Sequence, residues 1–367
     1  MFFFLFLSVL FLSYSNGAND NFKGVATLFG SKTTNYKSAL FWATAMTFLG
    51  SISALFLSSN LTLSFSGRGL VSDTMVSSDI FLISVGAGAA VTVWLATILG
   101  FPISTTHALV GALVGAGIAS GSDMHFEKLW KSFFMPLLAS PLISVGLTLL
   151  LYPFFKLARQ KLNVQEETCV CIGEKVELVQ VNSGGAVVLQ SSGLALTADQ
   201  MQVCQQKYFG TIVGVNAQES LNTLHYVTAG AVSFARGLND TPKITALLAA
   251  GNLMGINNYM LLVGLGMALG GLLNARKVAL TMGKKITAMN HGQGFTANLV
   301  TAFIVIFASR WGLPASTTHV SCSALFGIGI VNKKADWNVI RNIFYSWLIT
   351  LPLAALFSFL IFYLFGL

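Results

Sequence analysis

The chain has 367 residues, of which 54% are hydrophobic and only 9% are charged, and its mean hydropathy is +0.72. Because soluble domains carry roughly a quarter charged residues, this composition excludes a soluble enzyme built around one large core. The formal net charge of +8 suits nucleic acid or an anionic membrane surface in principle, so the placement of the basic residues has to decide its meaning.

About ten apolar segments follow one another along the chain. A helix needs roughly 20 apolar residues to cross about 30 Å of hydrocarbon. The segments lie at about 2–30, 38–59, 79–100, 103–121, 132–156, 214–251, 254–274, 293–311, 314–330 and 341–365. None shows the alternation of a membrane-spanning strand. The sequence therefore predicts an all-α polytopic membrane protein.

The first and sixth segments are too long for one straight crossing. Each contains an Asn-Asp pair, Asn19-Asp20 in the first and Asn239-Asp240 in the sixth. We therefore expect both segments to be broken helices. A signal peptide is the alternative for the first, but it lacks a basic start and a small-x-small cleavage site.

The basic residues are unevenly divided between the loops. If the N-terminus lies outside and each segment crosses once, four basic residues fall in the outer loops: Arg68, Lys128, Lys131 and Arg310. The inner loops hold Lys32, Lys37, Lys156, Arg159, Lys161, Arg276, Lys277, Lys284, Lys285, Lys333, Lys334 and Arg341. This is the positive-inside pattern. It predicts both termini outside, in a multi-pass protein of a bacterial-type inner or plasma membrane, and no nucleic-acid partner.

One polar stretch, at 157–210, separates the apolar segments of the two halves of the sequence. Val176 to Gln190 has the pattern of a β-hairpin that turns at Ser183-Gly184-Gly185. The charge pattern places this small insert in the cytoplasm. It separates a first transmembrane repeat at 1–156 from a second at 211–367.

Two polar motifs occur twice in the same order, which indicates a duplicated unit. Gly17-Ala18-Asn19-Asp20-Asn21-Phe22-Lys23 matches Gly237-Leu238-Asn239-Asp240-Thr241-Pro242-Lys243, and Phe101-Pro102-Ile103-Ser104-Thr105-Thr106-His107 matches Leu313-Pro314-Ala315-Ser316-Thr317-Thr318-His319. Five crossings in each half give the halves opposite orientation. Inverted repeats with polar residues at matching depths are typical of secondary transporters.

The first motif supplies charged groups at membrane depth. A carboxylate there is costly unless it is paired, hydrated or bound to a cation. Asp20 and Asp240, with the amides of Asn19 and Asn239, are therefore candidates for binding a coupling cation such as sodium. The alternative is that Asp20 pairs with Lys23 and Asp240 with Lys243, each within one helical turn. No other metal and no cofactor is predicted.

The second motif supplies hydroxyl trios, which we define as Ser104-Thr105-Thr106 and Ser316-Thr317-Thr318. A proline at a helix start leaves free N–H groups, and Ser and Thr cap helices well. Hydroxyls at the positive end of a helix suit an oxyanion, so the trios, with Lys23 and Lys243, form the predicted anion site. Back-bonding of the hydroxyls within their own helices is the alternative.

His107 and His319 each follow a hydroxyl trio. Imidazole titrates near neutral pH, which makes both candidates for proton carriers. A simple hydrogen bond to a neighbouring helix explains them equally well.

On these paired motifs the chain resembles the inorganic phosphate transporter family, which includes sodium- or proton-coupled phosphate carriers and sulfate permeases. The resemblance implies a helical, homodimeric carrier that works by alternating access. Family members often have Asn where this chain has Lys23 and Lys243, Glu in place of Asn298, and Gln or Asn in place of Leu95. These departures leave sodium or proton as the coupling ion, and phosphate or sulfate as the anion.

The sequence thus predicts a secondary transporter of inorganic phosphate in the lipid bilayer, and not an enzyme. A sulfate permease of the same fold is the first alternative, and an anion channel is the second. Because hydrogen phosphate can donate a hydrogen bond to a carboxylate and sulfate cannot, Asp20 and Asp240 favour phosphate. Because two lysines would balance the two aspartates, uptake is expected to depend more on pH than on sodium.

Overall fold

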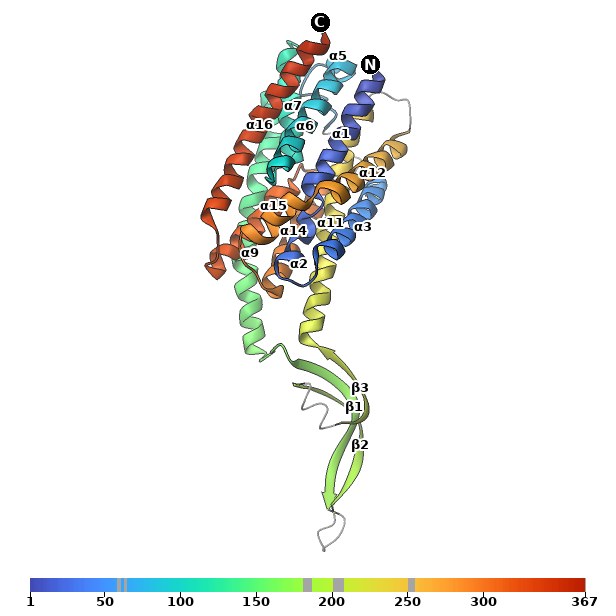
Figure 1. Cartoon of the computed structure of the whole chain (residues 1–367), viewed down its shortest axis with the longest axis vertical. Coiled ribbons are helices and arrows are strands. Elements are labelled where there is room, and N and C mark those ends of the chain that lie inside the picture. The colour runs from blue at the N-terminus through green and yellow to red at the C-terminus, as the bar shows by residue number, and fades with distance from the viewer. Residues whose placement is uncertain (58–60, 63–64, 181–186, 201–207, 250–254, 367) are drawn as a thin grey trace. The chain divides into compact units, whose positions relative to one another are not determined.

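The structure is a computed structural model that describes residues 1–57, 61–62, 65–180, 187–200, 208–249 and 255–366. Its elements divide into a helical unit, Met1–Tyr152 with His225–Leu367, and a smaller unit, Pro153–Leu224. The helical unit confirms the predicted all-α membrane class (Figure 1).

Helices occupy the ten predicted positions. In the described part of the chain, seven are long and apolar enough to cross a membrane: Phe2–Gly30 (α1 with α2), Tyr36–Leu57 (α3), Asp79–Leu99 (α6), Phe126–Lys161 (mostly α9, Met135–Lys161), Ile256–Asn274 (α12), His291–Arg310 (α14) and Trp337–Gly366 (α16). The remaining positions hold α7 (Thr105–Ala119), α11 (Ala217–Ala249) and α15 (Thr317–Asn332). α7 and α15 are shorter than the expected crossings because each follows an extended segment that contains the proline of its motif.

The first predicted helix break is present and the second is not. α1 (Phe2–Asp20) stops at the Asn-Asp pair, and a 3-10 turn at Lys23–Val25 leads into α2 (Ala26–Gly30). α11 instead runs unbroken through Asp240 and Pro242. The expected break there is wrong: an interior proline removes one helix hydrogen bond and crowds the carbonyl four residues before it, but α11 is buried around Pro242 and stays continuous.

The two repeats pack with matching close contacts. A Cβ at Gly17 would lie 2.0 Å from the carbonyl oxygen of Met267 on α12, and a Cβ at Gly237 would lie 2.1 Å from that of Thr47 on α3. Only glycine permits such backbone approach. Both motif glycines therefore let the helix that carries the Asn-Asp pair lie directly against a neighbouring helix.

Both ends of the chain lie at the same end of the helical unit (Figure 1). The rings of Phe4 on α1 and Phe365 on α16 are 5.8 Å apart. This fits the prediction that the two termini share one side of the membrane. Which side that is remains a prediction.

The smaller unit contains a three-stranded antiparallel sheet. Its strands are β1 (Thr168–Gln180), β2 (Val187–Gln200) and β3 (Tyr208–Asn216), in the order β2-β1-β3. The predicted hairpin corresponds to β1 and β2, which pair from Thr168 opposite Gln200 to Gln180 opposite Val187. Its predicted turn at Ser183-Gly184-Gly185 lies outside the described residues. β3 continues past the expected insert boundary at residue 210.

Candidate functional site

The hydroxyl trios lie at two buried helix starts. Ser104 and Ser316 are the N-caps of α7 and α15, and each accepts a hydrogen bond from the backbone N–H three residues on, at His107 and His319. Serine side chains stabilise helix starts in this way. The expected helix starts are thus present, and the two serine oxygens act as caps.

Lys23 lies at the centre of four oxygen atoms. Its ammonium donates to Asp20 Oδ1, to Asn19 Oδ1 at 3.0 Å, to the carbonyl oxygen of Ile103 at 2.7 Å, and to Thr318 Oγ1. The lysine side chain is 1% exposed. The ammonium therefore has its hydrogen-bonding capacity filled by both repeats, since Thr318 comes from the second.

Lys243 repeats this arrangement in the second repeat. Its ammonium donates to Thr106 Oγ1 and to the carbonyl oxygen of Ala315, both at 2.8 Å, and lies 3.7 Å from Asp240 Oδ1. Thr106 belongs to the first repeat, so each lysine reaches the hydroxyl trio of the other repeat. Such an exchange of partners is what a two-fold relation between the repeats produces.

Asn19 on α1 and Asn239 on α11 form hydrogen bonds to the extended segments that precede α7 and α15. Asn19 Nδ2 donates to the carbonyl oxygen of Phe101 at 3.0 Å, and its Oδ1 accepts from the backbone N–H of Ile103 at 3.2 Å. Asn239 Nδ2 donates to Asp240 Oδ1 at 2.9 Å and to the carbonyl oxygen of Ala315 at 3.1 Å. Asn239 thus shares the Ala315 carbonyl with Lys243, and Asn19 holds the backbone N–H of Ile103, the residue whose carbonyl Lys23 contacts.

Asn16 and Arg236 join the site, although the sequence interpretation did not include them. Arg236 Nη2 donates to Asn16 Oδ1 at 2.6 Å, and its Nη1 donates to Asn21 Oδ1 at 3.1 Å. Asn16 Nδ2 then donates to Thr105 Oγ1 at 2.9 Å and to Asp240 Oδ2 at 3.2 Å. The signal was present in the sequence: a polar residue directly precedes the glycine of each Asn-Asp motif.

Matching residues of the two repeats touch one another at the centre. Asn16 and Arg236 hold equivalent positions and are hydrogen-bonded. His107 and His319 are also equivalent, and their ring centroids are 4.4 Å apart. Residues related by a two-fold axis meet only close to that axis. The pseudo-two-fold axis therefore passes through the polar centre.

The structure brings most of the predicted site residues into one cluster. Buried side chains gather there from both repeats: Asn19, Asp20, Lys23, Ser104, Thr105, Thr106, Asn239, Asp240, Lys243, Ser316, Thr317 and Thr318. His107 Nδ1 and His319 Nε2 are buried and have no hydrogen-bond partner in the described part of the chain. The imidazole of His319 makes a hydrogen bond to the backbone of Leu137 on α9, so the expected bond to a neighbouring helix is present there, and a proton-carrying role stays a prediction.

The buried charges of this centre are not balanced. Lys23, Arg236 and Lys243 face only two carboxylates, and all five residues are at most 3% exposed. Buried charges are stable only when paired or well hydrogen-bonded. By formal charge the centre has one more basic than acidic side chain, which suits an anionic ligand.

Comparisons with known proteins agree with this geometry. Residues 16–358 match the family described as "Phosphate transporter family". The chain belongs to the phosphate transporter family. A protein named as a phosphate permease in Thermococcus kodakarensis is 28% identical over 95% of this chain and 93% of that protein. One named as a low-affinity inorganic phosphate transporter in Rhizobium meliloti is 27% identical over 95% and 92%.

A solved structure has the same fold as this family member. The structure titled "The sodium-dependent phosphate transporter" superposes with a TM-score of 0.74 and covers 99% of this chain and 98% of its own. Its sequence identity is 21%. The likeness confirms the helical fold, while the family match supports an integral membrane protein that transports phosphate.

Proposed function

We propose that this chain is a secondary active transporter that moves inorganic phosphate across the membrane by alternating access. The observation that carries the proposal is the exchange of partners at the centre: Lys23 contacts Thr318, and Lys243 contacts Thr106. Two inverted repeats that share one polar site on their axis can rock about it and expose it to either side in turn.

The anion is proposed to bind between the two helix starts. Thr105, Thr106, Thr317 and Thr318 stand in the first turns of α7 and α15, beside the capping serines. Hydroxyls and free N–H groups at the positive ends of two helices favour a tetrahedral oxyanion. The surplus cation of the centre adds an attraction that each lysine, occupied by its own aspartate, does not supply alone.

The two ammonium groups are proposed to stand where a coupling cation would otherwise bind. Carboxylate, amide, carbonyl and hydroxyl oxygens are the ligands of hard cations, and Lys23 is surrounded by one of each. A second cation would be repelled by the ammonium already there. We infer that phosphate uptake depends more on a proton gradient than on a sodium gradient.

The membrane arrangement follows from the charge pattern. Both termini are proposed to lie outside, and the insert between the repeats inside, because the basic loops lie on the insert's side. The carrier is proposed to be a homodimer, as the resemblance to the family implies.

Uptake of labelled phosphate into proteoliposomes tests the proposal. Sodium and pH gradients are imposed separately, and sulfate is added as a competitor at the same concentration as phosphate. We expect saturable, uphill uptake under an inward proton gradient and little response to sodium. Sulfate should compete weakly. Downhill flux that no gradient can drive uphill would instead indicate an anion channel, and strong competition by sulfate would indicate a sulfate permease.

A further inference from the structure

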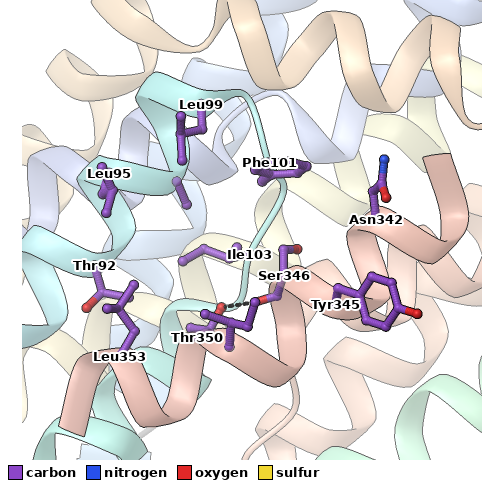
Figure 2. A pocket seen from close by; sticks show the side chains of 12 residues that line it. Thr92, Leu95, Leu99, Phe101, Ile103, Asn342, Tyr345, Ser346, Thr350 and Leu353 are labelled. Carbon is purple, nitrogen blue, oxygen red and sulfur yellow. Dashed lines mark hydrogen bonds between the residues drawn. The ribbon is translucent and has the colours of Figure 1, made fainter. Parts of the chain in front are cut away.

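A cavity is lined by α6, α16 and the extended segment that precedes the first hydroxyl trio (Figure 2). It has a volume of about 260 Å³ and lies between α6 and α16. Leu95, Ala96 and Leu99 line it from α6, and Phe101 and Ile103 line it from the extended segment before α7. The hydroxyl of Thr350, from α16, donates to its own helix at the carbonyl oxygen of Ser346. The hydroxyls of Thr92 and Ser346 likewise donate to their own helices, which leaves Asn342 and Tyr345 as the polar side chains of a mainly apolar lining.

A second cavity of about 390 Å³ lies at the corresponding place in the other repeat, between α9 and α14. Phe307, Ala308 and Trp311 line it from α14. Counted back from the proline of each hydroxyl motif, these three occupy the same positions as Leu95, Ala96 and Leu99. The same kind of cavity thus recurs although most side chains that line it differ. Recurrence in both repeats makes an accidental packing gap a poor explanation.

The second cavity is also apolar and also faces the bilayer. Apart from Ser140, the thioether of Met135 and the ring nitrogen of Trp311, the side chains of its lining are hydrocarbon. The four helices that form the two cavities are all among the apolar spans. Leu99 is 62% exposed and Trp311 67% exposed, which places large apolar side chains at the open edges. In a membrane these edges meet lipid, so the natural occupant is a hydrocarbon chain.

Basic side chains stand at one end of each cavity. Lys277 donates to the carbonyl oxygen of Ile98, one residue before Leu99, and the exposed Arg341 directly precedes Asn342 of the first lining. At the second cavity, the exposed Arg310 directly precedes Trp311. Two basic residues thus flank the first cavity and one flanks the second, and each Lys or Arg near the membrane surface attracts anionic lipid headgroups.

We propose that each cavity binds one acyl chain of an anionic phospholipid, whose headgroup lies against the basic residues at the cavity's end. A second copy of the chain is the competing occupant. A two-fold dimer in a bilayer has its axis along the membrane normal, and one such contact would cover only one of two cavities that lie on different helix pairs. The bilayer reaches both.

The acyl chain would rest on the back of the central site. Ile103, which lines the first cavity, gives its carbonyl oxygen to Lys23, and Ala315, which lines the second, gives its carbonyl oxygen to Lys243. The lipid therefore supports the extended segments from the membrane side. Lipid binding can nevertheless be measured without transport. The lipid proposal can therefore be tested independently of the proposed function.

Native mass spectrometry of the purified full chain, loaded with phosphatidylglycerol, tests the proposal. Ala96→Trp and Ala308→Trp each fill one cavity. Ile98→Trp on α6 and Leu142→Trp on α9 are matched controls, because both positions face the membrane but line neither cavity. We expect two tightly retained lipids per chain, one in each cavity variant, none in the double variant and two in the controls. Equal retention in all variants would overturn the proposal.

A second measurement uses the unaltered protein and does not depend on the variants folding. Phosphatidylglycerol with a photoreactive diazirine on its acyl chain is added, and the adducts are mapped by peptide sequencing. Adducts should concentrate several-fold on Leu95, Leu99, Phe307 and Trp311 over Ile98 and Leu142. Adducts spread evenly over membrane-facing residues, or cross-links between two copies at these positions, would refute it. Equal labelling by phosphatidylcholine would refute the role of the basic residues.

Discussion

Lys23 and Lys243 place two positive charges where oxygen atoms converge. Each has a carboxylate one helical turn away and a backbone carbonyl of an extended segment in contact. A lysine ammonium is part of the protein, so it is not released together with the substrate. A carrier built this way holds its cations permanently, so the energy for uphill transport has to come from another ion.

Changing both lysines to Asn should alter the ion that drives uptake. The Lys23→Asn, Lys243→Asn variant leaves Asp20 and Asp240 without their ammonium partners, within sets of oxygen atoms suited to a cation. We expect weaker phosphate binding, a new dependence on sodium, or both, measured as uptake against sodium concentration at fixed pH. Lys161→Asn, at an exposed position, is the control. A steep sodium requirement in the unaltered protein would contradict the idea.

Removing two hydroxyls from one trio should weaken anion binding. In the Thr105→Val, Thr106→Val variant, each lost hydrogen bond to a charged ligand should cost about 1.5–3 kcal/mol, or roughly tenfold or more in affinity for each hydroxyl. Phosphate binding to purified protein measures the loss. Thr301→Val is the matched control, because that buried threonine donates to its own helix at Ala297. Unchanged affinity in the double variant would remove the trio from the anion site.

Arg236 is the cation that no aspartate neutralises fully, and it also holds the helix break in place. Its guanidinium donates to Asn16, Asn21 and Thr47, and its Nε lies 3.8 Å from Asp240. Arg236→Gln removes the surplus charge of the centre and some of these contacts. We expect lower phosphate affinity together with a loss of stability of about 3–5 kcal/mol, the range for breaking a buried charge pair.

Thermal unfolding and phosphate binding of the same Arg236→Gln sample separate the two effects. Arg236→Lys should recover part of the affinity, because it restores the charge, but little of the stability, because an ammonium cannot reproduce the guanidinium fork. If both variants bound phosphate as the unaltered protein does, the surplus charge would have no part in anion binding.

At the level of helices, the two motif glycines determine how closely the Asn-Asp helices pack. Gly17→Ala would force a methyl group to within 2.0 Å of the Met267 carbonyl oxygen, so α1 and α12 would have to separate. We expect a strongly lowered melting temperature and lost uptake. Gly146→Ala on α9 is the control, since a Cβ there meets nothing within 4 Å; it should be neutral or stabilise slightly, by up to about 1 kcal/mol. Equal melting temperatures of the Gly17→Ala and Gly146→Ala variants would contradict this packing role.

The sequence predicted where the helices lie better than it predicted which of them are broken. Hydropathy placed all ten helices, and the repeated motifs placed both helix starts at Ser104 and Ser316. The same motif gave one break, after Asp20, and none at Asp240. The motifs are alike, so the difference comes from tertiary packing: α11 is buried along its whole second half, and a single sequence does not reveal which neighbours enclose a helix.

Contacts within the centre were predicted only where the motif itself contained both partners. The pairing of Lys23 with Asp20 follows from their spacing along one turn. The exchange of Thr106 and Thr318 between repeats, and the link from Arg236 to Asn16, join residues far apart in the chain. Such contacts depend on how the repeats are docked, which hydropathy and spacing do not specify.

At the scale of the whole molecule, the paired contacts of the centre all lie within the helical unit, and the insert forms a separate compact unit from Pro153 to Leu224. The sheet of the insert consists of β1, β2 and β3, which pair in the order β2-β1-β3. None of the site residues comes from it. The transport machinery should therefore consist of the two repeats alone.

Deleting the sheet tests that division of the molecule. Residues 165–216, which include β1 to β3, are replaced by a flexible Gly-Ser linker, so that α9 and α11 keep their own sequences. We expect phosphate uptake in proteoliposomes to stay within a few-fold of the unaltered protein, because every contact around Lys23 and Lys243 is retained. A second variant with a linker of equal length but different composition controls for the linker itself. If both variants insert and purify as folded protein yet transport nothing, the insert takes part in gating, and the two repeats are not sufficient.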